Sequence, residues 1–140
     1  MATKIETETK ATAEKDSRRN MIGFLYIALT ILFTVYGQVV IKWQVSQAGA
    51  FPPDFNEKIF FIAKLLLNPW VITALAGAFL ASLCWMAAMT QFELSFAYPF
   101  MSLAFVLVLI LSTVLFHEQV TWTKVAGTVI IISGLVVLTR

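Results

Sequence analysis

The sequence predicts an all-α membrane protein with four transmembrane helices. Hydrophobic residues make up 59% of the chain and charged residues only 13%, whereas a soluble domain carries about 25% charged residues. Most residues after position 20 fall into one of four long apolar stretches. Each stretch has the length of about 20 residues that a helix needs to cross a hydrocarbon core of about 30 Å. The expected spans are approximately residues 21–44, 69–90, 94–116 and 120–139.

Charged residues lie almost entirely outside the apolar stretches, which disfavours the alternative of a soluble helical protein. Lys42 follows the uninterrupted stretch Met21–Ile41, and Lys124 lies near the start of the fourth span. The net charge of +2 and the lack of a basic stripe interleaved with aromatics predict no nucleic-acid partner. Cys84 is the only cysteine, and no His/Cys cluster accompanies it, so we expect neither a metal nor a cofactor.

Residues 1–20 are rich in Thr, Lys, Glu and Ala without apolar periodicity, which predicts a disordered, solvated tail before a four-helix domain at 21–140. A cleaved secretory signal is the alternative. The first apolar stretch is too long for the apolar core of such a signal, which favours a retained helix. The basic tail, with Arg140 at the other end, places both termini in the cytoplasm, although four lysines would then lie toward the far side.

The longest connection, residues 46–68, predicts a segment between the first two spans. Pro52 and Pro53 break any helix at its start, and Phe55–Leu67 is amphipathic. This segment is either an interfacial helix or an early, tilted start of the second span. Asn68-Pro69 then starts the second span proper, because Pro is tolerated in a first turn. The other two links are short, so neighbouring helices are antiparallel.

The first span carries a polar residue every fourth position, which places these residues on one helix face. They are Thr30, Thr34, Gln38 and Lys42. Polar groups in hydrocarbon are costly and mark function. Lys42 either extends to the headgroups or pairs with an anionic headgroup such as a lipid phosphate. The deeper Gln38 is expected to bind a ligand or another helix rather than face lipid.

Ser95, Tyr98 and Ser102 share a face at the start of the third span, where Pro99 removes one backbone donor. This region forms either the polar wall of a cavity or simply an interfacial helix start with an aromatic residue. Glu93 and Glu118 lie in the short links, where a solvated acid is favourable at a helix N-terminus. The spans contain no nucleophile–base pair and no paired carboxylates, so we expect no enzyme and no catalytic residue.

Small residues in the second and fourth spans predict close helix packing. Ala74, Ala78 and Ser82 recur at four-residue spacing, as do Gly77 and Ala81, and the fourth span has Gly127 and Gly134. One four-helix chain encloses little space for a substrate. We therefore expect a homodimer or heterodimer with the fourth helix as its seam.

Two motifs in these spans resemble known transporters. Gly37-Gln38-Val39-Val40-Ile41-Lys42 resembles the Gly-x-x-x-x-Lys signature of small four-helix proteins in the drug/metabolite transporter superfamily, which includes small multidrug resistance-like and EamA-like members. Leu94-Ser95-Phe96-Ala97-Tyr98-Pro99, His117-Glu118 and the Gly-containing last helix resemble the third and fourth helices of that superfamily. The resemblance covers about Met21 to Leu138.

Two branches of this superfamily can be compared. The small multidrug-resistance branch has an essential glutamate three residues before the glycine, where this chain has Thr34. The other branch has Gly-Gln-x-x-x-Lys and Ala-Tyr-Pro, and both patterns stand here. In this respect the chain is similar to subunits that flip aminoarabinose-phosphoundecaprenol across the bacterial inner membrane.

The resemblance implies a flippase for a polyprenyl-phosphate lipid, with or without a linked sugar, in a bacterial inner membrane. Lys42 would attract the phosphodiester, and Gln38 and Tyr98 would bond phosphate or sugar oxygens. The alternatives are a small multidrug or cation exporter, which needs a carboxylate in the pathway, and a membrane scaffold subunit that transports nothing. The full set of expected substrate-binding residues is Thr34, Gln38, Lys42, Glu93, Ser95, Tyr98, Ser102 and Glu118.

Overall fold

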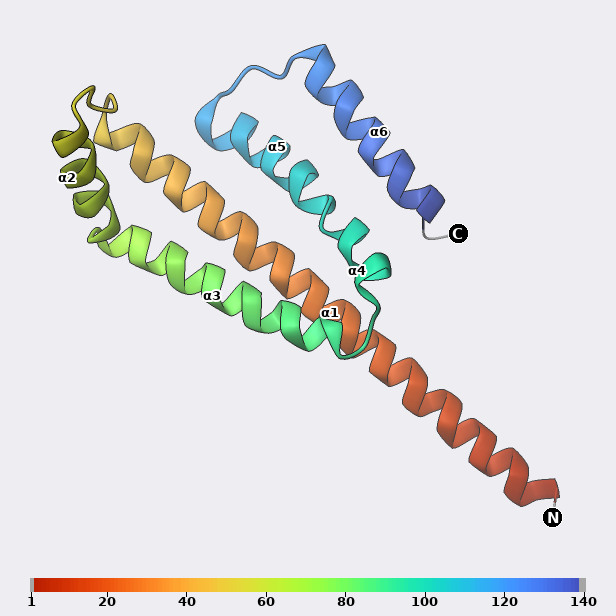
Figure 1. The fold of residues 1–140 in the computed structure, drawn as a ribbon. Helices are drawn as coiled ribbons and strands as arrows, with labels where there is room; N and C mark the ends of the chain where they lie inside the picture. Colours follow the sequence, from red (N-terminus) through yellow and green to blue (C-terminus); the bar gives the residue numbers. More distant parts are fainter. Residues whose placement is uncertain (1, 139–140) are drawn as a thin grey trace.

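The computed structural model describes residues 2–138, and these residues form helices and no strand (Figure 1). Thr139, the expected end of the fourth span, and Arg140 lie outside the described residues. The helices in chain order are α1 (Ala2–Ala48), α2 (Phe55–Leu66), α3 (Pro69–Met89), α4 (Leu94–Phe100), α5 (Leu103–Phe116) and α6 (Trp122–Leu138).

Three helical segments are long and apolar enough to cross a membrane. They are Thr12–Ala48 within α1, α3 itself, and Leu94–Phe116, which contains α4 and α5. The shorter apolar helix α6 follows at the place of the expected fourth span. The expectation of an all-α membrane protein is therefore confirmed, and the chain is a multi-pass membrane protein.

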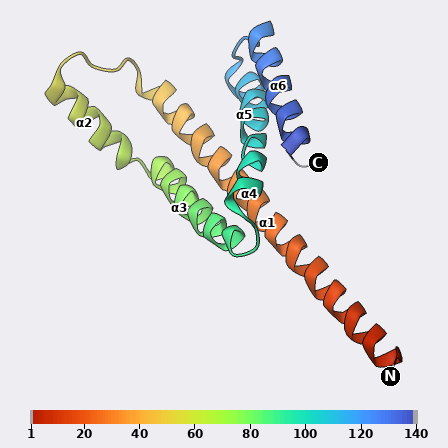
Figure 2. The ribbon, with the colours of Figure 1, turned by 45° about the vertical axis from the view of Figure 1, so that its right-hand side comes forward.

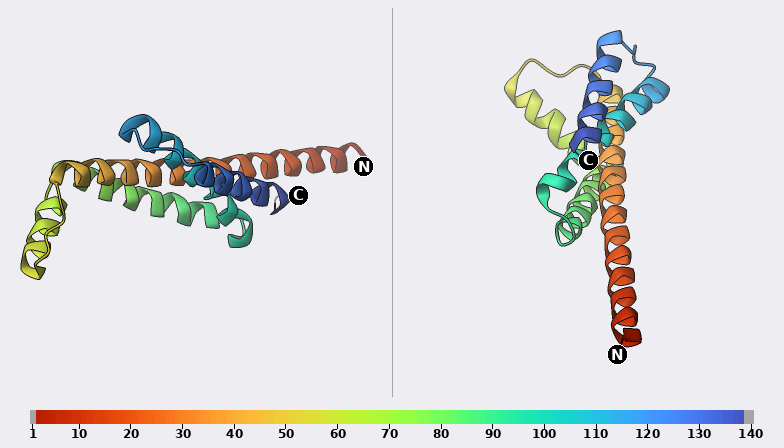
Figure 3. Two further views of the ribbon diagram at one scale, coloured as in Figure 1. Left: turned by 90° about the horizontal axis from the view of Figure 1, so that it is seen from above. Right: turned by 90° about the vertical axis from the view of Figure 1, so that its right-hand side faces the viewer.

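Helix α1 differs from the expected disordered tail, because it is continuous from Ala2 into the first span. Figures 1 and 3 show its N-terminal part extending beyond the other helices. Ala, Lys and Glu favour helix intrinsically, and Glu14 and Arg18 form an ion pair of 3.3 Å across one turn. Residues 12–20 are all exposed, so the segment is helical yet solvated.

Helices α1 and α3 form the closest packing in the bundle. Helix α3 buries small residues at this contact: Ala74, Gly77, Ala81 and Ala88. Thr30 of α1 is 3% exposed, and its hydroxyl donates to the Tyr26 carbonyl at 2.8 Å and lies 3.5 Å from the Ala81 carbonyl. The small residues expected on the second span therefore separate into two groups, because Ala78 and Ser82 point away from this contact and remain exposed.

Helix α2 is separate from the second span, so the alternative of an early start of that span is wrong. Leu67 and Asn68 interrupt the helix, and Asn68 caps α3 by accepting a hydrogen bond from the Trp70 amide at 2.9 Å. The Asn68 amide nitrogen also donates to the buried side chain of Gln44 at 3.1 Å. Figures 1 and 3 show α2 turned away from the direction of α1 and α3.

The third span is broken into α4 and α5 two residues after Pro99. The amides of Met101 and Ser102 donate to the carbonyls of Tyr98 and Pro99, each three residues back rather than four. These bonds form a tighter turn directly after Pro99, and this turn separates α4 from α5. Pro99 therefore lies within the span and interrupts it, rather than marking its first turn.

Helix α6 begins at Trp122, two residues later than expected, because the Thr121 carbonyl accepts the first hydrogen bonds, from the amides of Lys124 and Val125. Figures 1 and 2 show α6 beside α5 and on the opposite side of the bundle from α3. It has no buried residue, and a Cβ added at Gly127 or Gly134 would meet nothing within 4 Å.

Candidate functional site

Two cavities lie along the polar face of α1. Cavity 1, of about 480 Å³, lies between α1, α5, the link after α5, and α6. Cavity 2, of about 760 Å³, lies between α1, α3, α4 and α5. Gln38, Phe105 and Val108 line both cavities. The Gln38 amide therefore stands at the boundary of the two spaces.

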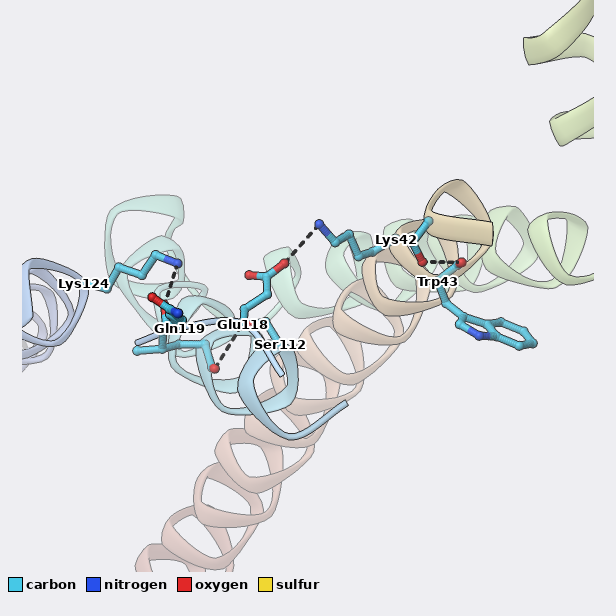
Figure 4. Close-up of polar contacts among 8 residues, drawn as sticks. Lys42, Trp43, Ser112, Glu118, Gln119 and Lys124 are labelled. Atoms are coloured by element: carbon cyan, nitrogen blue, oxygen red, sulfur yellow. Dashed lines mark hydrogen bonds and ion pairs between the residues drawn. The ribbon is translucent and has the colours of Figure 1, made fainter. Parts of the chain in front are cut away.

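The charged end of cavity 1 contains an ion pair between Lys42 and Glu118 (Figure 4). Helix α5 ends at His117, whose left-handed φ of 51° reverses the chain, a conformation in which His is enriched among non-glycine residues. The Glu118 amide then donates to the Ser112 carbonyl at 3.3 Å. This turn directs the carboxylate toward α1, where Oε1 lies 3.0 Å from the Lys42 Nζ.

Lys124 is a second cation lining cavity 1, and its ammonium donates to the Gln119 carbonyl at 3.3 Å (Figure 4). Lys124 was not among the expected site residues, although it is the one charged residue within the fourth span and Thr128 follows it one turn later. Both residues line the cavity. Most of the remaining wall is apolar: Val39, Phe105, Val108, Leu109, Phe116 and Ile131. Cavity 1 thus combines a charged end with an apolar body.

Cavity 2 is lined by uncharged polar groups. Thr30, Thr34 and Gln38 come from one face of α1, and Ser82, Tyr98 and Ser102 come from α3 and the third span. The Tyr98 ring meets the Trp85 ring edge-on with centroids 6.0 Å apart, so Trp85 also faces this cavity. The Gln38 amide and the Thr34 and Tyr98 hydroxyls can donate hydrogen bonds to a sugar or phosphate and accept them from a sugar. The Thr30 and Ser82 hydroxyls already donate to the carbonyls of Tyr26 and Phe79.

The structure brings together six of the eight expected substrate-binding residues. Gln38, Lys42 and Glu118 line cavity 1, and Gln38 also joins Thr34, Tyr98 and Ser102 in cavity 2. The other two line neither cavity. Ser95 is exposed, and Glu93 precedes α4 beside a separate hollow formed by the link between α3 and α4.

The described residues contain no group of three or more His, Cys, Asp or Glu side chains that could hold a metal ion. Together, the two cavities provide charged groups at one end, hydrogen-bonding groups along α1, and apolar walls between them. This combination suits an amphiphile with an anionic headgroup.

Comparison with known proteins identifies related chains. The EamA-like transporter family matches residues 54–140. A probable 4-amino-4-deoxy-L-arabinose-phosphoundecaprenol flippase subunit ArnF from Erwinia tasmaniensis is 31% identical over 123 residues, covering 84% of this chain and 94% of the relative. A probable ArnE subunit of the same flippase from Pseudomonas aeruginosa is 34% identical over 111 residues, covering 79% and 91%. No solved structure matches the chain.

Proposed function

The chain belongs to the EamA-like transporter family, and on that premise we propose that it is a subunit of a flippase for a sugar-linked polyprenyl-phosphate lipid in a bacterial inner membrane. One observation carries this proposal. An apolar cavity with Lys42 and Lys124 at its charged end adjoins, through Gln38, a second, uncharged cavity whose lining includes hydroxyl groups. The names of the relatives, which are subunits of a flippase for a lipid-linked sugar, support the same class of substrate.

The lipid phosphate would bind first at Lys42. A lysine ammonium attracts phosphate as a point charge with three donors, and Lys124 adds a second positive charge on the same cavity. The sugar would then meet Gln38 and, beyond it, Thr34 and Tyr98 in cavity 2. A polyprenyl chain is far larger than either cavity, so it would remain in the bilayer against the exposed apolar faces of the helices.

A second subunit would complete the pathway. Helix α6 exposes its apolar surface, and Gly127 and Gly134 leave open space on it. Faces with small residues let transmembrane helices approach closely. We place the seam of a homodimer or heterodimer at α6, and the partner's helices would then close the side of cavity 1 that this chain leaves open.

The basic N-terminal segment supports an orientation with both termini in the cytoplasm. Helix α6 ends at the same end of the bundle as the link between α3 and α4 (Figure 1). In this orientation the charged end of cavity 1 would face the periplasmic side, and cavity 2 would lie closer to the cytoplasmic side.

Native mass spectrometry in mild detergent tests the proposal. We expect the wild-type protein to retain a sugar-linked undecaprenyl phosphodiester, and Lys42→Gln to retain it at least about tenfold more weakly, since a hydrogen bond to a charged group contributes about 1.5–3 kcal/mol. Lys64→Gln is the matched control, because Lys64 is an exposed lysine of α2 that lines neither cavity 1 nor cavity 2. The same spectra report the oligomeric state.

Equal retention by wild type and Lys42→Gln would contradict the role of Lys42. Absence of any retained prenyl lipid, together with proton release on adding a quaternary ammonium compound, would favour the cation exporter. Co-purification with a larger complex and no lipid movement in reconstituted vesicles would favour the scaffold.

A further inference from the structure

The carboxylate of Glu118 occupies the place at Lys42 where the proposed function puts a lipid phosphate. Its Oε1 lies 3.0 Å from the Lys42 Nζ, and both side chains line cavity 1. A phosphate that binds Lys42 must therefore displace this carboxylate or lie beside it. In either case Glu118 remains next to the bound headgroup, because the turn at His117 holds its backbone against the end of α5.

Three charged side chains line cavity 1: Lys42, Glu118 and Lys124. Two ammonium groups and one carboxylate leave one net positive charge. Lys42 and Lys124 are exposed, but the Glu118 side chain is only 35% exposed, so water screens its carboxylate less than on an open surface. The net charge of a ligand therefore decides how well this end of the cavity accepts it.

The two common forms of a lipid phosphate differ in charge. A phosphodiester carries one negative charge, whereas a phosphomonoester carries about −1.5 to −2 at pH 7. The diester neutralises the net positive charge of the site. The monoester brings additional negative charge beside the Glu118 carboxylate, and like charges at short range oppose binding.

We propose that Glu118 is a specificity-determining residue that makes cavity 1 select a phosphodiester-linked lipid over the corresponding phosphomonoester. The inference rests on the proposed function, because it concerns the headgroup of the same lipid. Its consequence is that the carrier lipid enters the cavity when a sugar is attached and is rejected when its phosphate is bare. Repulsion of a competing ligand is a common source of specificity.

Competition between two lipids tests this role. Equal concentrations of undecaprenyl phosphate and a sugar-linked undecaprenyl phosphodiester are added to the purified protein, and native mass spectrometry gives the ratio retained. We expect wild type to prefer the diester by about tenfold, the order expected from one unmatched unit charge at a partly exposed site. Glu118→Gln should abolish or reverse this preference. Glu57→Gln, an exposed acid of α2 outside both cavities, should keep it.

Two further variants keep the test decisive if Glu118→Gln does not fold. Glu118→Asp retains the charge and should retain the preference. Lys124→Gln removes one positive charge, so it should weaken both lipids but increase the preference for the diester, opposite in direction to Glu118→Gln. An unchanged ratio in Glu118→Gln, or equal retention of both lipids by wild type, would overturn the inference while leaving the flippase proposal standing. Failure of wild type to retain either lipid would instead contradict the proposed function.

Discussion

Gly37 of α1 lies directly against the backbone carbonyl of Ala74 in α3, and a Cβ at Gly37 would stand 3.2 Å from that oxygen. The two helices can therefore approach closely at this level. Because successive residues of a helix are rotated by about 100°, the next residue, Gln38, turns away from α3 and lines both cavities. The contact thus orients the polar face of α1 as well as packing the bundle.

The close approach at Gly37 predicts a stability effect. Gly37→Val should destabilise the protein by about 1–3 kcal/mol, because an inserted side chain would overlap a backbone atom that has little freedom to move. Thermal unfolding in detergent, followed by circular dichroism, measures the effect. Ala76→Val is the control, since Ala76 is an exposed small residue of α3 that lines neither cavity 1 nor cavity 2. Equal unfolding temperatures for the two variants would show that α1 and α3 tolerate a wider separation.

The position of Gln38 between the cavities predicts a kinetic effect. Gln38→Leu should slow lipid translocation about tenfold or more, because a headgroup that passes between the cavities would lose a hydrogen bond worth about 1–3 kcal/mol. Retention of the lipid at Lys42 should change little. The flipping rate of a fluorescent sugar-linked prenyl phosphodiester in vesicles, divided by the amount bound, measures this effect.

Gln47→Leu is the matched control for this experiment, because Gln47 is an exposed amide of the same helix that lines neither cavity 1 nor cavity 2. A normal flipping rate in Gln38→Leu would exclude a role for this amide in passage. Loss of binding in the same proportion as the rate would instead assign Gln38 to the initial binding step.

Helix α2 predicts a pattern of membrane depth. Its strongly apolar face is exposed, and it consists of Phe55, Ile59, Ile62 and Leu66. Beside its junction with α3, Trp43 and Trp70 pack edge-on with ring centroids 5.5 Å apart, and Trp residues favour the membrane interface. We expect α2 to lie in this interface with that face in the lipid.

Nitroxide labels attached to single cysteines in a Cys84→Ser background measure this depth, since Cys84 is the only native cysteine. A label at Ile59 should be relaxed mainly by oxygen, and a label at Glu57 mainly by a water-soluble reagent. Equal accessibility of the two positions would show that α2 does not lie in the interface.

Much of the fold follows from the sequence because hydropathy and helix periodicity are local properties. The apolar stretches, the helix start at Asn68-Pro69 and the shared face of Thr34, Gln38 and Lys42 depend on neighbouring residues along one helix, and the structure contains all of them. The composition of residues 2–20 suggested a disordered segment, but these residues are helical in the structure. Their high intrinsic helix propensity outweighs the lack of an apolar face. The periodic pattern also could not decide whether Phe55–Leu67 belonged to the second span.

The candidate site could be predicted only in part from the local properties of single helices. Lys42 and Glu118 were both selected, but as independent charges with separate roles. Their contact depends on the left-handed turn at His117 and on the packing of α5 against α1. Lys124 was not among the expected site residues, because nothing in its own helix shows that the start of α6 returns to the end of α1.

The sequence by itself determined that this chain spans a membrane, roughly which residues form its apolar spans, and which residues form the polar face of the first span. These properties follow from the free energy of placing each residue in hydrocarbon or water. Only the tertiary structure decided that Glu118 pairs with Lys42, that Gln38 lies between two cavities, and that α6 remains uncovered. These depend on how segments far apart in the chain pack together, and side-chain volume and turn geometry set that packing.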